Sequence, residues 1–200
     1  MVRIDDSNER VKCWLDFPDE IKILEQKARE RDWEQEIAIQ LMARIGCRSS
    51  GVLTARPENL EWNNTGEYWE IAIRGKNTKG GEKTVRDAYV PDSVKQNLDR
   101  YQSERDISPD EPYISKSVKT VERWVREITD EIAETHGERW EHVSSHDCRR
   151  SWATHHLVEK DVAVRVMMSI GGWSDYKAIE PYLAKPSSEK IGEELSKIEA

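Results

Sequence analysis

One strand–turn–strand pattern interrupts an otherwise helical sequence and so limits the folds open to this chain. Residues 67–75 (EYWEIAIRG) alternate in polarity, with Trp69, Ile71 and Ile73 on one face, as expected of a half-buried strand. A polar, glycine-containing turn (GKNTKGGEK) follows, and a second strand-like stretch, TVRDAYVP, ends at Pro91. We therefore expect a β-hairpin with a long basic tip.

Helical periodicity fills the sequence on both sides of this hairpin. We expect a first helix with Asp16 or a neighbour as its cap and Pro18 in its first turn. Its apolar face carries Ile21, Leu24 and Ala28. A second helix ends at Gly46, and its hydrophobic residues recur at helical spacing: Trp33, Ile37, Leu41 and Ile45. The sequence predicts an α+β fold, mostly α, with one small antiparallel sheet packed on helices.

Composition argues for a globular protein of the cytoplasm. Eight tryptophans and six tyrosines argue against disorder, because disordered chains are poor in aromatic residues. No apolar run is long enough to cross a membrane, and the N-terminus MVRIDDSNERVK lacks the apolar segment of a secretion signal. The three cysteines are widely spaced, which fits reduced thiols better than disulfides or a zinc site: Cys13, Cys47 and Cys148.

The charge balance bears on the class of ligand. With 39 Asp and Glu against 31 Lys and Arg, the net charge of −8 lowers the expectation of a nucleic-acid partner. A high density of carboxylates also fits a protein from a salt-rich cytoplasm. At roughly 1 M salt the Debye length is about 3 Å, so net repulsion is not felt across the molecule. The acidic balance therefore does not exclude DNA.

The stretch SSHDCRRSWATHHL concentrates arginines, histidines and a cysteine in one predicted helix. Ser144 and Asp147 form a capping-box pattern, which predicts a helix start near Ser145. His146 and Arg149 then share a face of the first turn, beside free backbone N–H groups and the positive end of the helix dipole. This arrangement favours a phosphate or another oxyanion. The alternative is a core histidine beside a surface arginine.

Four further residues are candidates because of their positions in the sequence. Arg48 follows the helix-ending Gly46, and Lys76 stands at the mouth of the hairpin. Trp173 follows a glycine pair in GGWSDYKAIEPYL, and Tyr182 comes nine residues later. Each residue has an ordinary structural alternative. Arg48 would cap helix carbonyls, Lys76 would be a solvated turn lysine, and Trp173 and Tyr182 would pack between helices. Their order along the chain is what connects them.

In this order the six candidates resemble the tyrosine recombinase (phage integrase) family. The family pattern is an arginine after a helix-ending glycine, a hairpin lysine, H-x-x-R, a histidine or tryptophan, and a tyrosine nine residues further on. HDCRRSWATHHL matches the family motif H-x-L-R-H-x-F-A-T-H-x-L at His146, Arg149, Ala153, Thr154, His155 and Leu157. The resemblance spans about residues 14–183 and implies the catalytic-domain fold of that family.

The resemblance also implies a reaction, the cleavage and rejoining of DNA strands through a 3′-phosphotyrosine without metal, ATP or another cofactor. Tyr182 is implied as the nucleophile that attacks the scissile phosphate and frees a 5′-hydroxyl. Arg48 and Arg149 would hold the non-bridging oxygens, which the planar guanidinium group can bond in pairs. Lys76 is implied as the general acid, and His146 would assist proton transfer at the tyrosine.

Other positions depart from the family pattern or compete with it. Trp173 stands where most members have histidine, and its indole N–H would donate to a phosphate oxygen. Lys79 and Lys83 share the hairpin turn, so they are rivals for the role of general acid; with Arg150 they are also candidate DNA contacts. Gly51 stands where the family often has glutamate, which leaves the support of the first arginine open.

The resemblance implies an N-terminal extension or linker (1–12), a catalytic domain (13–185) and a C-terminal helix (186–200) that is exchanged between protomers or folds back on its own domain. Double-stranded DNA and a homo-oligomer on DNA, in a tetrameric synapse, are the implied partners. Two alternatives stay open. One is an integrase-like DNA-binding protein that regulates recombination without catalysing it, and the other is a type IB topoisomerase-like activity. Together with the acidity, the resemblance points to a halophilic archaeon or its virus as the source.

Overall fold

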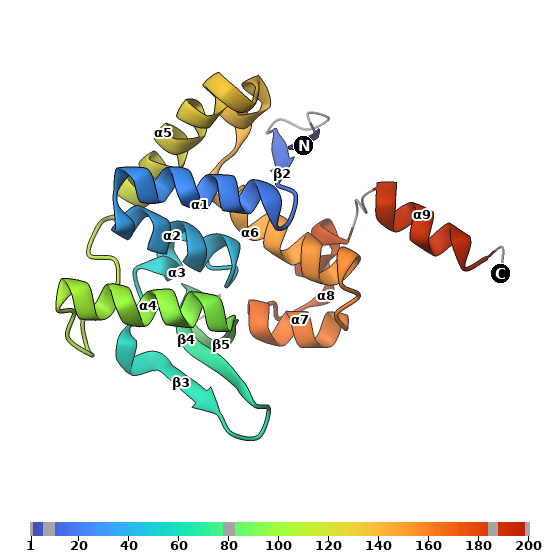
Figure 1. Cartoon of the computed structure of the whole chain (residues 1–200). Coiled ribbons are helices and arrows are strands. Elements are labelled where there is room, and N and C mark those ends of the chain that lie inside the picture. Colours follow the sequence, from blue (N-terminus) through green and yellow to red (C-terminus); the bar gives the residue numbers. More distant parts are fainter. Residues whose placement is uncertain (1, 6–10, 78–82, 184–187, 199–200) are drawn as a thin grey trace.

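Helices make up most of the structure, and two small antiparallel sheets complete it (Figure 1). It is a computed structural model that describes residues 2–5, 11–77, 83–183 and 188–198. The helices are α1 (Asp19–Arg31), α2 (Trp33–Ala43), α3 (Ser49–Val52), α4 (Asp92–Arg105), α5 (Val118–His136), α6 (Ser145–Thr154), α7 (Val164–Gly171), α8 (Tyr176–Ile179) and α9 (Ser188–Ser196). The strands are β1 (Arg3–Asp5), β2 (Lys12–Trp14), β3 (Leu60–Asn63), β4 (Tyr68–Asn77) and β5 (Lys83–Val90). The predicted class, α+β and mostly α, is confirmed.

The first two helices bring their predicted hydrophobic faces into the core. The apolar face of α1 is fully buried through Ile21, Leu24 and Ala28. The start of α1 differs from the prediction, because no side chain caps it and Pro18 stands just before its first residue. Asp16 contributes its backbone carbonyl instead, which accepts the Glu20 N–H at 3.1 Å.

Gly46, in the short segment that follows α2, has a backbone conformation that favours glycine. Its φ is +72°, and a Cβ there would lie 2.3 Å from the Trp152 ring. A Gly46→Ala change is expected to lower the free energy of unfolding by about 2–5 kcal/mol, because left-handed backbone costs ~1–2 kcal/mol and overpacking ~1–3 kcal/mol. Urea unfolding followed by tryptophan fluorescence measures this loss. Gly137, with φ +100° and no atom within 4 Å of an added Cβ, is a control for backbone strain without overpacking; a loss below about 1 kcal/mol in Gly46→Ala would contradict both costs.

The larger sheet has the order β3–β4–β5, with antiparallel neighbours. Its β4–β5 hairpin is the one that the sequence predicts, and the alternation of β4 buries Ile71 and Ile73. Sequence reasoning missed β3, a strand of four residues that pairs Trp62 with Trp69. Ile73 lies opposite Arg86 in the β4–β5 register, so an arginine occupies a position on the buried face of β5.

A second, two-stranded sheet joins the N-terminal residues to the domain, and sequence reasoning missed it as well. Strand β1, inside the expected extension of residues 1–12, pairs with β2. Val2 is buried in the main core, and the Cys13 N–H donates to Asp147 Oδ1 of α6 at 3.0 Å. Residues 2–5 therefore pack on the domain beside the start of α6.

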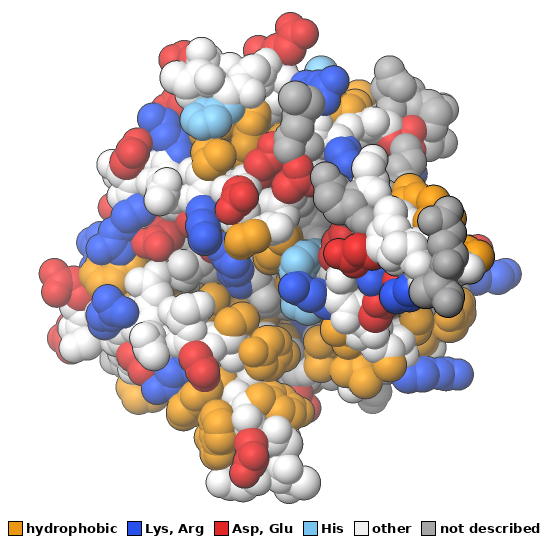
Figure 2. Space-filling model, turned by 45° about the vertical axis from the view of Figure 1, so that its right-hand side comes forward, with side chains coloured by type: hydrophobic (Ala, Val, Ile, Leu, Met, Phe, Trp, Pro, Cys, Tyr) orange, Lys and Arg blue, Asp and Glu red, His pale blue; other side chains and the backbone are white. Residues whose placement is uncertain are grey.

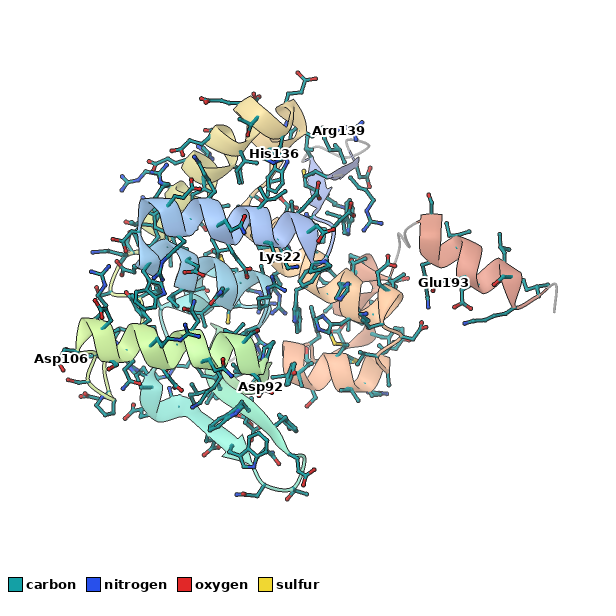
Figure 3. The ribbon with its side chains drawn as sticks, viewed as in Figure 1. Lys22, Asp92, Asp106, His136, Arg139 and Glu193 are labelled. Carbon is teal, nitrogen blue, oxygen red and sulfur yellow. The ribbon has the colours of Figure 1, made fainter. Side chains whose placement is uncertain are left out.

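The buried side chains form two clusters. The larger one joins α1, α2, α4, α5 and the three-stranded sheet, and the smaller one surrounds Trp152, Trp173 and Tyr182. In Figure 3, Asp92 and Asp106 mark the two ends of α4, while Glu193 of α9 lies on the opposite side of the molecule. The smaller cluster packs α6, α7 and α8 together and contains two of the six candidate residues, Trp173 and Tyr182.

The cysteines are unpaired and buried, and none of the described helices is long and apolar enough to cross a bilayer. Burial raises the pKa of Cys13 to about 11 and that of Cys148 to about 12, and it raises the pKa of Cys47 as well. Within the described residues, no group of three or more His, Cys, Asp or Glu side chains is placed to hold a metal ion.

Candidate functional site

Arginines from three separate elements line one small pocket. Arg48 stands at the start of α3, Arg74 and Arg86 come from the β4–β5 hairpin, and Arg149 comes from α6. No Asp or Glu is among the described residues that line this pocket. On the face drawn in Figure 2, by contrast, acidic and basic side chains are interleaved. The pocket therefore holds a local positive charge suited to an anion, although the chain as a whole carries a net charge of −8.

Arg149 is the most deeply buried of these side chains. It is 1% exposed, and its Nη1 and Nη2 donate to the carbonyls of Gly46 and Gly171, the latter at 2.7 Å. Its Nε–H has no acceptor among the described residues. Burial, followed by the nearby charges of Arg86 and Arg48, lowers the pKa of Arg149 to about 9. An anion in the pocket would offset this repulsion.

Trp173 lies against Arg149, and Tyr182 lies against Trp173. The guanidinium carbon of Arg149 is 4.4 Å from the Trp173 ring centroid, and the Trp173 and Tyr182 ring centroids are 5.2 Å apart. The Thr154 hydroxyl donates to the Tyr182 carbonyl at 3.1 Å and so ties the tyrosine backbone to α6. A Cβ on Gly171 would lie 1.8 Å from the Trp173 ring, so the glycine makes room for the indole.

The start of α6 is fixed by Asp147. In the predicted capping box, Asp147 Oδ2 accepts the Ser144 N–H at 2.9 Å, and the helix begins at Ser145 as predicted. The same carboxylate forms an ion pair with Arg150. Arg150 is therefore a half-buried partner of the helix cap, and its contact with DNA stays a prediction.

His146 is exposed beside this cluster of arginines. Removal of water by the surrounding protein, followed by the charges of Arg150, Arg149 and Arg48, lowers the pKa of His146 to about 4. The imidazole is consequently neutral at pH 7, and a neutral imidazole can accept a proton. The structure thus brings five of the six candidates into one region: Arg48, His146, Arg149, Trp173 and Tyr182.

The hairpin lysines are placed only in part. Lys76 lies in β4 directly after Gly75, whose backbone lines the arginine pocket. Lys83 begins β5, and Lys79 lies outside the described residues. The roles of all three lysines stay predictions.

His155, next to this site, supplies a pH dependence of stability. Its ring stacks on Phe17 with centroids 4.4 Å apart, and burial, followed by His156, Lys160 and Arg44, lowers its pKa to about 4. An unfolded histidine titrates near pH 6.5, so between there and pH 4 only the unfolded chain binds the proton, and stability falls as the pH falls. A His155→Phe variant keeps the ring stack without the titrating group. Calorimetry is expected to show a smaller loss of melting temperature between pH 7 and pH 5 in this variant; equal losses would contradict the assignment.

Arg86 is a residue that sequence reasoning missed. Its Nη2 donates to the Gly46 carbonyl at 3.0 Å, and its Nη1 donates to the Ile170 carbonyl. One signal was present in the sequence. In TVRDAYVP, Arg86 has the same parity as the buried Ala88 and Val90, so a half-buried strand places it on the apolar face.

A model of the phage integrase family matches residues 14–189. The chain belongs to the phage integrase family. No curated protein sequence matches it significantly. Among solved structures, XerA recombinase shares 18% identity with a TM-score of 0.70, covering 94% of this chain and 65% of that one.

Two structures with bound DNA have the same fold. The Tn1549 transposon integrase in complex with transposon right end DNA shares 16% identity with a TM-score of 0.70, covering 98% of this chain and 68% of that one. XerH site-specific recombinase in a post-cleavage complex with its difH substrate shares 16% identity with a TM-score of 0.68, covering 94% and 53%. This member of the phage integrase family therefore spans between about half and two thirds of the length of these three recombinase and integrase chains.

Proposed function

We propose that this chain is the catalytic domain of a site-specific DNA recombinase, which cleaves and rejoins strands through a 3′-phosphotyrosine without metal or ATP. The observation that carries the proposal is the pocket lined by arginines and free of described carboxylates, with Trp173 packed against its most buried guanidinium, that of Arg149, and Tyr182 packed against Trp173. Such a pocket is suited to a phosphate, and Tyr182, which packs on Trp173, supplies the nucleophile.

The covalent step would exchange one ester for another. The Tyr182 oxygen attacks the scissile phosphorus, a phosphotyrosyl bond forms, and the bond to the 5′-oxygen breaks. Arg48 and Arg149 hold the two non-bridging oxygens and stabilise the charge that develops on them. Because the ester energy is kept in the phosphotyrosine, attack by a 5′-hydroxyl of another strand reverses the step without an external energy source.

Proton transfers complete the reaction. His146, neutral at pH 7 because its pKa is about 4, takes up the proton of the attacking tyrosine. Lys76 donates a proton to the leaving 5′-oxygen; its place in β4 directly after Gly75, which lines the pocket, supports this role. Trp173 contributes an N–H donor to a phosphate oxygen and carries no proton itself.

Double-stranded DNA and further copies of the chain are the proposed partners. The fold neighbours include recombinases bound to DNA, among them a lambda integrase dimer on a core site (17% identity, TM-score 0.53, covering 82% of this chain and 46% of that one). Helix α9 exposes Ile191 and Leu195 to 46% and 55%, one turn apart, while Lys190 anchors its start to Asp161 at 2.6 Å. Burial of this apolar stripe on a neighbouring copy would link subunits around a tetrameric synapse.

The test is a search for a covalent adduct at high and low salt. Duplexes with a randomised core carry a nick just 3′ of the position to be cleaved, so that the short 5′-hydroxyl fragment diffuses away and cleavage is trapped. We expect SDS-stable complexes, and sequencing the attached DNA would yield the preferred site. DNA binding without adduct at every salt concentration would contradict catalysis and favour the regulatory alternative. Relaxation of supercoils without any joining of sites would favour a topoisomerase.

A further inference from the structure

Two guanidinium groups converge on one backbone carbonyl at the centre of the candidate site. The Gly46 carbonyl accepts hydrogen bonds from Arg149 Nη1 and from Arg86 Nη2, the latter at 3.0 Å. Each guanidinium also binds the end of α7, Arg86 through the Ile170 carbonyl and Arg149 through the Gly171 carbonyl. The segment after α2 and the end of α7 are thus joined twice, once from the sheet and once from α6.

These two segments lead directly into candidate catalytic residues. Arg48 lies two residues after Gly46, and Trp173 lies two residues after Gly171. Helix C-terminal carbonyls carry partial negative charge, so a cation that binds them there is electrostatically favoured. Arg86 therefore fixes the backbone from which two phosphate-binding side chains extend.

The surroundings of Arg86 are built for this contact. Arg86 lies opposite Ile73 on the buried face of the sheet, and burial lowers its pKa. Its side chain packs over Gly172, where an added Cβ would lie 2.7 Å from Arg86 Cδ. Both of its terminal nitrogens donate to backbone carbonyls, which identifies a role in holding the backbone.

We propose that Arg86 is a positioning residue of the strand-cleavage reaction. It holds the backbone segments that carry Arg48 and Trp173 in a fixed position relative to Arg149. The proposal rests on the proposed function. A displacement of about 1 Å at a reacting group can lower a rate on the order of 10²-fold, whereas DNA contacts elsewhere on the surface would be unaffected. Loss of Arg86 is therefore expected to act on the cleavage step and not on DNA affinity.

The kinetic test uses Arg86→Gln and Arg86→Lys on the nicked duplex selected by adduct formation. At saturating DNA and at a temperature where each variant is folded, Arg86→Gln is expected to cleave about 10–100-fold more slowly, with its DNA dissociation constant changed less than about threefold. Arg86→Lys, which keeps a donor, is expected to recover part of the rate. The control is Arg31→Gln, which removes two 2.5 Å bonds to Glu127 and Glu131 on the α1–α5 surface. It is expected to cleave at the normal rate.

A double-mutant cycle separates positioning from general destabilisation. If Arg86 acts through Arg48 and Trp173, the variant with both Arg48→Ala and Arg86→Gln loses less rate than the product of the two single losses. Independent losses that multiply, or a normal rate in Arg86→Gln, would overturn the proposal.

Hydrogen exchange gives a readout that does not depend on catalysis. Amides of residues 46–52 and 170–174 are expected to exchange faster in Arg86→Gln and unchanged in Arg31→Gln. If the wild-type chain formed no adduct, the proposed function would fail, while exchange in these two segments would still decide whether Arg86 holds them. Unchanged exchange in Arg86→Gln would overturn the positioning role whatever the activity.

Discussion

Replacement of Tyr182 by Phe is expected to abolish the covalent adduct while DNA affinity and stability stay close to those of the wild type. The change removes one oxygen only. The ring still packs at 5.2 Å from the Trp173 ring, and the hydrogen bond from Thr154 goes to the backbone carbonyl of residue 182, which is retained. Loss of a nucleophile that works as a unit with its neighbours lowers a rate on the order of 10⁶-fold, so no adduct should be detected.

A matched control comes from α8. Tyr176 is 54% exposed and lies six residues before Tyr182, so Tyr176→Phe tests for attack by a nearby, more accessible hydroxyl. We expect Tyr176→Phe to form the adduct at the wild-type rate, as measured by gel quantification of SDS-stable complexes. Adduct formation that survives in Tyr182→Phe and is lost in Tyr176→Phe would assign the nucleophile to Tyr176 and contradict the proposed role of Tyr182.

Features that depend on a few consecutive residues could be predicted from the sequence. The Ser144–Asp147 capping box placed the start of α6 correctly, because its hydrogen bonds lie within one helical turn. Gly46, with φ of +72°, is the glycine that the pattern placed at the end of the second helix, and α2 itself ends three residues earlier at Ala43. The alternation of residues 67–75 predicted β4, since one face of that strand is buried.

Features that depend on distant partners could not be predicted in this way. Strands β1 and β3 are three and four residues long, and their pairing partners are what define them as strands. Arg86 binds carbonyls 40 and 84 residues away in the sequence, at Gly46 and Ile170. The spacing H-x-x-R was likewise compatible with a surface arginine, whereas Arg149 is buried because α2, α6 and α7 meet around it.

The net charge of the chain did not predict the arginine-lined pocket, because the charge around a site depends on which residues the fold brings together. On the surface between α1 and α5, acidic side chains form ion pairs with basic ones. Arg31, for example, is paired with both Glu127 and Glu131. Arg48 and Arg149, by contrast, meet no described carboxylate in their pocket. The net charge of −8 sums the charges of both regions. An anion in the pocket interacts mainly with charges within roughly a Debye length, about 8 Å at physiological ionic strength.

Replacement of Arg149 by Lys is expected to slow cleavage by about 10²–10³-fold, or ~2.7–4 kcal/mol in the barrier, with a smaller effect on DNA affinity. Arg149 bonds two backbone carbonyls, and its Nε–H has no acceptor among the described residues, so further N–H groups are available to donate to an anion. A lysine ammonium is a point charge with three donors and cannot hold two carbonyls and an oxyanion in the same plane. Single-turnover cleavage of the nicked duplex at saturating DNA measures the effect, and Arg31→Lys on the far surface is the control for the loss of a guanidinium. Because Arg149→Lys keeps the positive charge, a rate within about threefold of the wild type would mean that charge alone stabilises the transition state, and the geometric role of the buried guanidinium would have to be abandoned.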